Sequence, residues 1–293
     1  MSEPKHLVNA QVLFGSGFAA GVVVTGLLNP VDRALFLSVS KRRPFLDPRN
    51  WTKPFQGLGQ SMVGRAASTG LWFPIERLVN QALQHPGRAH ELSPAVKSAL
   101  AGQVAGVANA VLLSPLAFIK YQTWGLPEGK RSFSRTAAKV YRTVGPLSFF
   151  RGLPATVVRD ALFGGCFGSM RFELRSRVEG REPSAHVSMG ALHFGADCAA
   201  AGVATVLSSP LNYARNLQFA TRLTDAVPST MSAMYSLGWE AARQPSMHAA
   251  TGLLLRRTNI GWGTLRVAGG MALTAKLFAG CVVVAEALIS FDQ

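Results

Sequence analysis

The sequence has few charged residues and very few acids. Asp, Glu, Lys and Arg make up 15% of the 293 residues, whereas soluble domains carry about 25%. Only 15 residues are acidic against 30 Lys and Arg, so the formal net charge is +15. Hydrophobic residues make up 48%, and there are 29 glycines. This balance is typical of a protein that crosses a membrane several times, and the positive charge favours an acidic partner such as nucleic acid or anionic lipid.

Motifs of enzymes and metal sites are also missing. Cys166, Cys198 and Cys281 lie far apart, which excludes a CxxC metal or redox motif and a disulfide framework. The six histidines have no metal-ligand spacing, and no nucleophile–base set or carboxylate pair stands out. We therefore predict no enzyme, no metal site and no cofactor beyond a bound lipid.

Two binding motifs are considered and set aside. Residues 15–20, GSGFAA, fit the G-x-G-x-x-A dinucleotide fingerprint, but the apolar run continues through Leu28 and no βαβ unit follows. Nucleic-acid binding is not favoured, because aromatic residues are not interleaved with basic ones. The N-terminal ten residues are neither an Arg-rich amphipathic leader nor a signal peptide, so targeting information is expected to be internal.

Six segments are long enough to cross a membrane, which takes roughly 20 mostly apolar residues. Three contain at most one charged residue and span 8–29, 98–119 and 187–211. Three more polar candidates span about 58–83, 154–177 and 263–287. The two kinds alternate, which predicts a helix hairpin repeated three times and an all-α membrane protein with six transmembrane helices.

A proline interrupts each of the three apolar segments in the same context. The stretches are LLNPVDRALFLS (27–38), LLSPLAFIKYQT (112–123) and LSSPLNYARNLQ (207–218). Pro30, Pro115 and Pro210 are therefore predicted to kink their helices, because proline removes an i→i−4 hydrogen bond.

Small residues precede these prolines in register. Thirteen and nine residues before the proline lie Gly17 and Gly21 in the first repeat, and Gly102 and Gly106 in the second. In the third repeat Asp197 takes the first of these positions. A GxxxG pair allows close helix packing in lipid, so we expect it in two repeats.

The second half of each repeat also recurs. PFQGLGQSMVGR (54–65) and FFRGLPATVVRD (149–160) both read aromatic-x-Gly with an Arg seven or eight residues later. The third copy, within 250–266, is blurred and allows Gly252 with Arg256 or Gly263 with Arg266. Amphipathic surface helices are expected at 130–142 and 230–243, and the shorter first repeat is expected to lack most of its own.

These features together resemble the mitochondrial carrier family. The match to its Pro-x-acid-x-x-base motif is partial at PVDRAL, PLAFIK and PLNYAR, and FRG at 150–152 matches the second motif fully. The resemblance covers a single domain, 1–293, with repeats 1–90, 91–182 and 183–293. It implies a six-helix bundle in the mitochondrial inner membrane, with pseudo-threefold symmetry, short matrix-side surface helices, and both termini on the intermembrane-space side.

The resemblance implies a matrix gate of ion pairs between the acid of one repeat and the base of the next. The gate positions carried over are Asp32, Lys120, Asn212 and Arg215. Ala117 stands where an acid belongs and Leu35 where a base belongs, so only Asp32 with Lys120 forms a full pair. Losing two links shifts the resting equilibrium, unless neighbours such as Arg33 or hydrogen bonds of Asn212 compensate.

The resemblance also implies a cavity and a lipid site. Arg65, Arg159 and Arg266 are the expected cavity residues, and inward-facing Arg suits a small anion; the alternative is Arg reaching the headgroups. Asp197 is either functional or structurally paired. Gly57, Arg151 and Gly152 are the expected cardiolipin site; the alternative is general positive charge on the matrix-side loops.

Two functions remain open. The first is a carrier that moves a small anionic metabolite by alternating access. The second is a carrier-derived structural subunit of a larger respiratory complex, with little or no transport. The missing gate residues and the blurred third repeat favour the second, whereas the retained prolines, arginines and one gate pair favour the first.

Overall fold

Helices account for nearly all regular structure in the computed structural model, which describes residues 10–40, 43–55, 58–84, 92–124, 132–180 and 188–291. Six helices are long: α1 (Ala10–Ser40), α2 (Leu58–Gln84), α3 (Pro94–Trp124), α5 (Leu153–Glu179), α6 (Met189–Ala220) and α9 (Trp262–Phe291). Three are shorter: α4 (Phe133–Val144), α7 (Thr230–Ala242) and α8 (Met247–Thr258). Two 3₁₀ turns, η1 (Pro48–Asn50) and η3 (Pro146–Phe150), complete the described elements.

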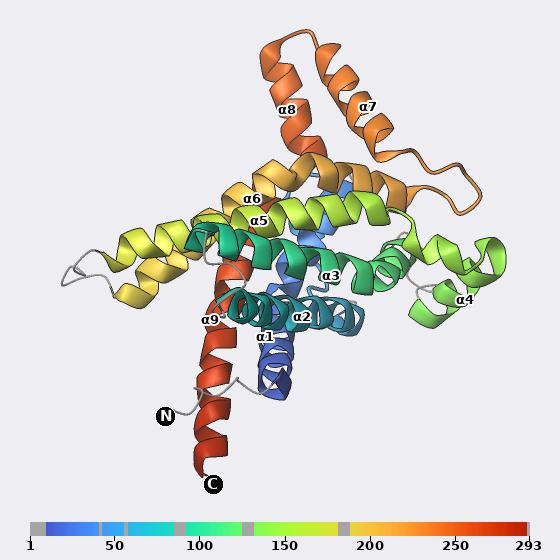
Figure 1. Cartoon of the computed structure of the whole chain (residues 1–293). Helices are drawn as coiled ribbons and strands as arrows, with labels where there is room; N and C mark the ends of the chain where they lie inside the picture. Colours follow the sequence, from blue (N-terminus) through green and yellow to red (C-terminus); the bar gives the residue numbers. More distant parts are fainter. Residues whose placement is uncertain are drawn as a thin grey trace.

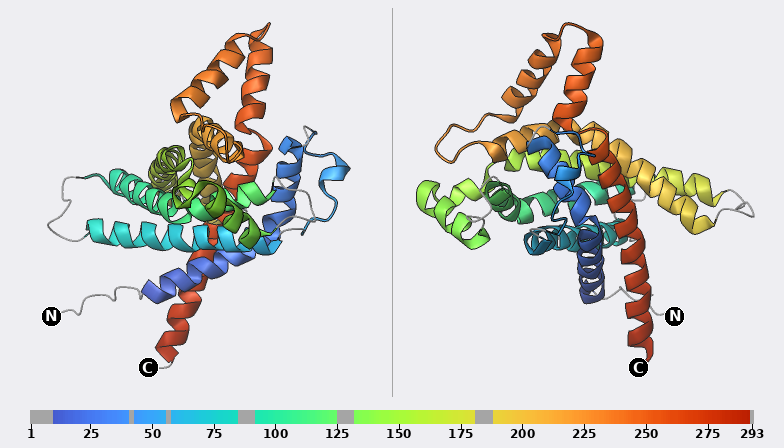
Figure 2. Two further views of the ribbon diagram at one scale, coloured as in Figure 1. Left: turned by 90° about the vertical axis from the view of Figure 1, so that its right-hand side faces the viewer. Right: turned by 180° about the vertical axis from the view of Figure 1, so that it is seen from behind.

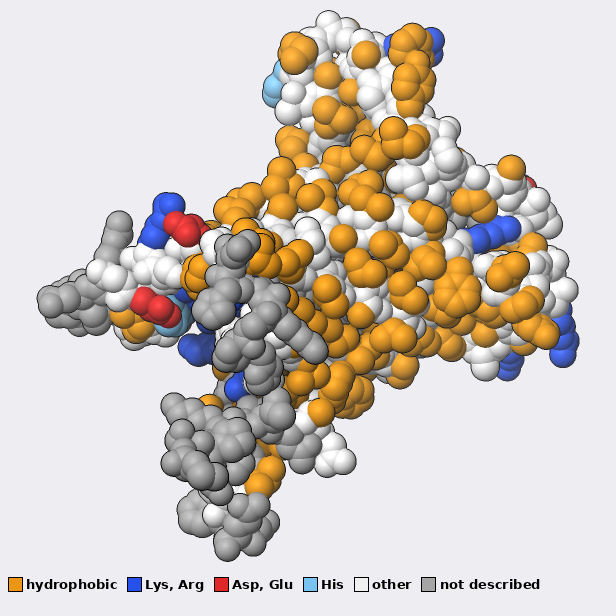
Figure 3. Space-filling view, in the orientation of Figure 1, with side chains coloured by type: hydrophobic (Ala, Val, Ile, Leu, Met, Phe, Trp, Pro, Cys, Tyr) orange, Lys and Arg blue, Asp and Glu red, His pale blue; other side chains and the backbone are white. Residues whose placement is uncertain are grey.

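Each long helix overlaps one of the six predicted segments, but α1, α3 and α6 continue beyond the predicted ends at 29, 119 and 211. Four of the long helices are apolar enough to cross a membrane. These are α1, α3, α6 and α9. α9 had been expected among the more polar candidates, but apart from Arg266, Lys276 and Glu286 it is apolar or small throughout. On the face in Figure 3, apolar side chains cover the middle of the molecule, and most charged side chains lie near its two lateral ends.

Glycines bring neighbouring helices into near backbone contact. A Cβ atom on Gly102 or Gly106 of α3 would overlap a backbone carbonyl of α5, at Gly164 and Asp160 respectively. A Cβ on Gly21 of α1 would lie 2.9 Å from the backbone of α2. The predicted GxxxG contacts are therefore present in the first two hairpins, where the absent side chain permits dispersion contacts between backbones.

The first and last long helices, α1 and α9, contact each other within the bundle. Figures 1 and 2 show α3, α5 and α6 side by side, with α9 crossing them steeply. α9 contacts α1 as well as α6, so the last hairpin meets the first. The beginning of α1 and the end of α9 point to the same side of the molecule.

The three prolines lie at corresponding points of three continuous helices. Pro30, Pro115 and Pro210 each fall about two thirds of the way along α1, α3 and α6. Beyond these helices the repeats differ. Among the described residues, the first has η1 alone, the second has α4 and η3, and the third has α7 and α8, which form a hairpin that projects from the bundle (Figure 1).

Candidate functional site

Two groups of charged side chains lie inside the bundle, and the first is close to the prolines. We call it the gate layer: Asp32, Arg159, Asn212, Arg215 and Arg266. Arg266 of α9 pairs with Asp32 of α1 through two parallel hydrogen bonds, and its Nη2 donates to Oδ2 over 2.7 Å. Only 7% of the Arg266 side chain and 10% of the Asp32 side chain are exposed. This forked arrangement is the strong, directional form of an Arg–carboxylate pair.

The other gate-layer residues are joined around Asn212 of α6. Arg159 of α5 donates from Nη1 to the Asn212 Oδ1 over 3.1 Å, and Arg215 donates from Nη2 to the same oxygen over 2.7 Å. Arg159 also pairs with the neighbouring Asp160. Arg215 in addition donates to the Tyr121 hydroxyl of α3 and lies over its ring. Hydrogen bonds and a cation–π contact thus stand where the resemblance expects ion pairs.

The positions that lack a gate charge are filled by packing. Leu35 is buried, and Ala117 packs beside Phe118 and Phe219. Lys120 lies on α3 and is half-buried. Its ion pair with Asp32 stays a prediction, as does the gating role of these residues.

Of the three predicted cavity arginines, the structure describes the side chains of Arg159 and Arg266. Arg65 belongs to α2, but its side chain lies outside the described part of the molecule. Arg159 of α5 and Arg266 of α9 both belong to the gate layer, where they contact Asn212 and Asp32 respectively. Arg256, the alternative in the third repeat, belongs to α8 and is exposed.

The predicted lipid site is partly described. Gly57 lies outside the described residues. Gly152 precedes α5 with φ +73°, in the left-handed region that favours glycine, and a Cβ there would lie 3.0 Å from the Phe219 ring. Arg151 donates to the carbonyl oxygens of Arg222 and Leu223, over 3.2 and 2.6 Å. In the structure it therefore joins the start of α5 to the segment after α6.

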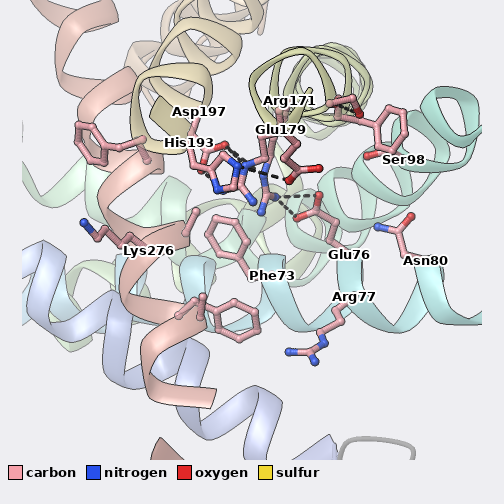
Figure 4. Close-up of a pocket in the computed structure, with 18 of the residues that line it drawn as sticks. Phe73, Glu76, Arg77, Asn80, Ser98, Arg171, Glu179, His193, Asp197 and Lys276 are labelled. Carbon is pink, nitrogen blue, oxygen red and sulfur yellow. Dashed lines mark hydrogen bonds and ion pairs between the residues drawn. The ribbon is translucent and has the colours of Figure 1, made fainter. Parts of the chain in front are cut away.

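The second group, which we call the charged cluster, comprises Glu76, Arg171, Arg175 and Asp197 (Figure 4). Arg175 of α5 donates from Nε to Asp197 of α6 over 2.8 Å, and 2% of the Asp197 side chain is exposed. Arg171 lies between Asp197, at 3.4 Å, and Glu76 of α2, at 3.3 Å. Its guanidinium also lies over the rings of Phe73 and Phe167. Two acids and two bases therefore compensate each other and connect three helices.

A cavity of about 720 Å³ borders this cluster. Its lining comes from α2, α5, α6 and α9, with Ser98 from α3. Two lining cations, Arg77 of α2 and Lys276 of α9, have no ion-pair or hydrogen-bond partner among the described residues. The Lys276 side chain is exposed and Arg77 is half-buried (Figure 4). The cavity thus offers two uncompensated positive groups beside a neutral network.

These bases recur along the second long helix of each hairpin, which is α2, α5 or α9. Arg77 and Arg171 each follow a predicted cavity arginine by twelve residues, and Lys276 follows Arg266 by ten. Since each residue rises about 1.5 Å along a helix, each of these bases lies roughly 15–18 Å along its helix from the predicted cavity arginine. Only Asp197 of the charged cluster had been singled out from the sequence, as a lone acid in an apolar segment. The available signal for Arg77, Arg171 and Lys276 was the recurrence of a basic residue ten or twelve positions after each predicted cavity arginine.

Four helices long and apolar enough to cross a membrane, together with a cavity lined by charged side chains, are features typical of a membrane transport protein. A family model described as mitochondrial carrier protein matches residues 91–174. The mitochondrial glycine transporter of Pyricularia oryzae is 26% identical, over 85% of this chain and 92% of its own. Residues 91–174 therefore match the mitochondrial carrier family, whose members are inner-membrane transporters of small solutes, and the chain is similar to such a carrier over most of its length.

Other relatives agree with this assignment. The mitochondrial glycine transporter of Botryotinia fuckeliana is 22% identical over 68% of this chain and 73% of its own. The mitochondrial glutamate carrier 1 of Rattus norvegicus is 33% identical, but over only 33% of this chain and 31% of its own. Both names belong to carriers of amino acids.

Proposed function

We propose that this chain carries a small carboxylate-bearing solute across the mitochondrial inner membrane by alternating access. All six long helices span the membrane in three hairpin repeats, 1–90, 91–182 and 183–293. The observation that carries the proposal is the cavity in which Arg77 and Lys276 have no carboxylate partner. A solute carboxylate can occupy that place through charge-assisted hydrogen bonds.

An α-amino acid is the class of solute that these groups suit best. Glu76 and Asp197 line the same cavity, so a solute ammonium can meet acidic oxygens there in competition with Arg171 and Arg175. The names of the relatives, glycine transporter and glutamate carrier, support the same class. A gate that is only partly ionic lies near the prolines and is formed by Asp32, Lys120, Asn212 and Arg215.

The second candidate is a carrier-derived subunit of a respiratory complex. Ala117 and Leu35 favour it, because they remove charges from two of the three expected gate links. The hydrogen bonds of Arg159 and Arg215 to Asn212 favour transport instead, because they keep polar links at these helix ends. Arg151 and Gly152, with Gly57, hold cardiolipin in either case.

Uptake into cardiolipin-containing liposomes tests the proposal. The purified full-length chain is expected to give saturable uptake of radiolabelled glycine or glutamate into liposomes loaded with unlabelled amino acid. In Lys276→Ala and Arg77→Ala the half-saturation concentration should rise about tenfold or more, because a hydrogen bond to a charged group contributes about 1.5–3 kcal/mol and 1.4 kcal/mol is tenfold.

The matched control is Arg257→Ala, which removes a base from the exposed Arg257–Glu240 pair of the α7–α8 hairpin and should leave uptake unchanged. If the wild-type protein takes up no amino acid or other carboxylate and is isolated only within a respiratory complex, the structural-subunit function stands and transport is refuted.

A further inference from the structure

The ion pair between Arg266 and Asp32 connects the last long helix of the chain to the first. Asp32 follows Pro30 by two residues, so it occupies the acid position of the first repeat. Its described ion-pair partner comes from α9, the second helix of the third hairpin, and both side chains are at most 10% exposed. A buried pair at this point holds the last third of α1 to the beginning of α9.

The contact between Arg159 and Asn212 has the same form one repeat earlier. Asn212 follows Pro210 by two residues, as Asp32 follows Pro30. Arg159 belongs to α5, the second helix of the second hairpin, and donates to Asn212 over 3.1 Å. In both cases an arginine of one hairpin reaches the acid position in the first helix of the next.

The two arginines are also equivalent within their own helices. Arg159 follows Gly152 by seven residues and Arg266 follows Asn259 by seven. Gly152 and Asn259 both adopt left-handed backbone conformations, with φ of +73° and +60°. Asn tolerates this conformation better than other residues with a Cβ. The third repeat therefore keeps the left-handed residue before its second helix, with Asn in place of Gly. This replacement explains why its aromatic-x-Gly motif is blurred.

The acid position of α3 is Ala117, which has no acceptor in its side chain. At the acid positions the three repeats therefore have a carboxylate, a methyl group and an amide, in chain order.

We propose that arginines of the second helices close the matrix end of this carrier. Arg266 is the gate base for Asp32 and Arg159 is the gate donor for Asn212, and both contacts break when the matrix side opens. The inference rests on the proposed transport function, because a gate has a role only in a protein that opens. It assigns to Arg266 and Arg159 a positioning role, although neither residue belongs to the Pro-x-acid-x-x-base motif of α1, α3 and α6.

We call the Arg266–Asp32 pair the latch. Spin-label distances between α1 and α9 test it without any transported solute. Labels at Leu27 and Leu265, both exposed, are introduced after the three cysteines are replaced by serine, and double electron–electron resonance is measured in liposomes. The distance is expected to be short in the wild-type background and longer and broader in Arg266→Ala. The charge exchange Asp32→Arg with Arg266→Asp should restore the short distance, and Arg257→Ala should not change it.

A gain-of-contact variant tests the gating role without weakening the fold. Asn212→Asp places a carboxylate where Arg159 and Arg215 already donate. The thermal unfolding temperature should rise while amino-acid exchange slows several-fold, because the closed state is stabilised relative to the open state. A variant that is more stable but exchanges at the wild-type rate would refute the gate at this link.

The outcomes separate the two proposals. A distance that does not change in Arg266→Ala overturns the latch even when wild-type uptake is normal. A distance that lengthens in Arg266→Ala and returns in the charge exchange supports the latch, even if no solute is transported by the wild type, in which case the transport function alone fails.

Discussion

At the residue scale, the charged groups inside the bundle matter because most of them are paired. Asp197 was open to two interpretations from the sequence, as a functional acid or as a structurally paired one. In the structure it is bound by Arg175 and Arg171 and is almost fully buried. An ionised carboxylate in such a place is tolerated when basic partners compensate the loss of hydration.

Asp197→Ala is therefore expected to destabilise the protein strongly. It leaves the Arg175 and Arg171 guanidinium groups without their common partner, and removal of one member of a buried pair costs about 3–5 kcal/mol. Thermal unfolding of the full-length protein in detergent measures the loss. Glu240→Gln is the control, because the exposed pair with Arg257 should contribute no more than about 1 kcal/mol. Equal unfolding temperatures for the two variants would contradict a structural role for Asp197.

At the element scale, the hairpins are held by backbone contact where glycine occurs in both helices. The α3–α5 hairpin is the closest packed, because Gly102 and Gly106 face Gly164 and the Asp160 carbonyl. The periodic spacing before each proline predicted this contact from the sequence. The matching glycines in α5 were not predicted, although Gly164 and Gly168 are themselves four residues apart and meet the α3 backbone at Gly102 and Ser98.

Gly102→Ala should separate α3 from α5 and lower the stability by about 1–3 kcal/mol, the usual cost of overpacking. Gly195→Ala in α6 is the matched control: it makes the same change in a long helix with no atom within 4 Å of the added methyl group. Its stability should be unchanged or higher, because Ala favours a helix by up to about 1 kcal/mol over Gly. The contact is refuted if the two variants unfold at the same temperature.

At the scale of the whole molecule, the bundle is closed by contact between its first and last long helices, α1 and α9. α9 contacts both α6 and α1, and the beginning of α1 and the end of α9 point the same way (Figure 1). The proposed topology of six spanning helices accounts for this arrangement, because an even number of crossings returns the chain to its starting side.

Epitope tags at the two termini test this topology. In mitochondria whose outer membrane has been ruptured, added protease should remove both tags while the matrix marker stays protected. This expectation combines the even number of spans with the predicted intermembrane-space location of the termini. Protection of one tag but not the other would contradict six crossings, and protection of both would reverse the orientation.

The sequence alone determined the features that depend on short-range order. Helix lengths, the register of Pro30, Pro115 and Pro210, and the GxxxG pairs all follow from residues a few turns apart, where backbone hydrogen bonding and side-chain size decide the outcome. The tertiary structure decided which charges meet. Asp32 and Arg266 are 234 positions apart in the chain, and Arg171 finds Glu76 only when α2 and α5 face one cavity. Such pairs depend on packing of distant helices, and no local pattern specifies them.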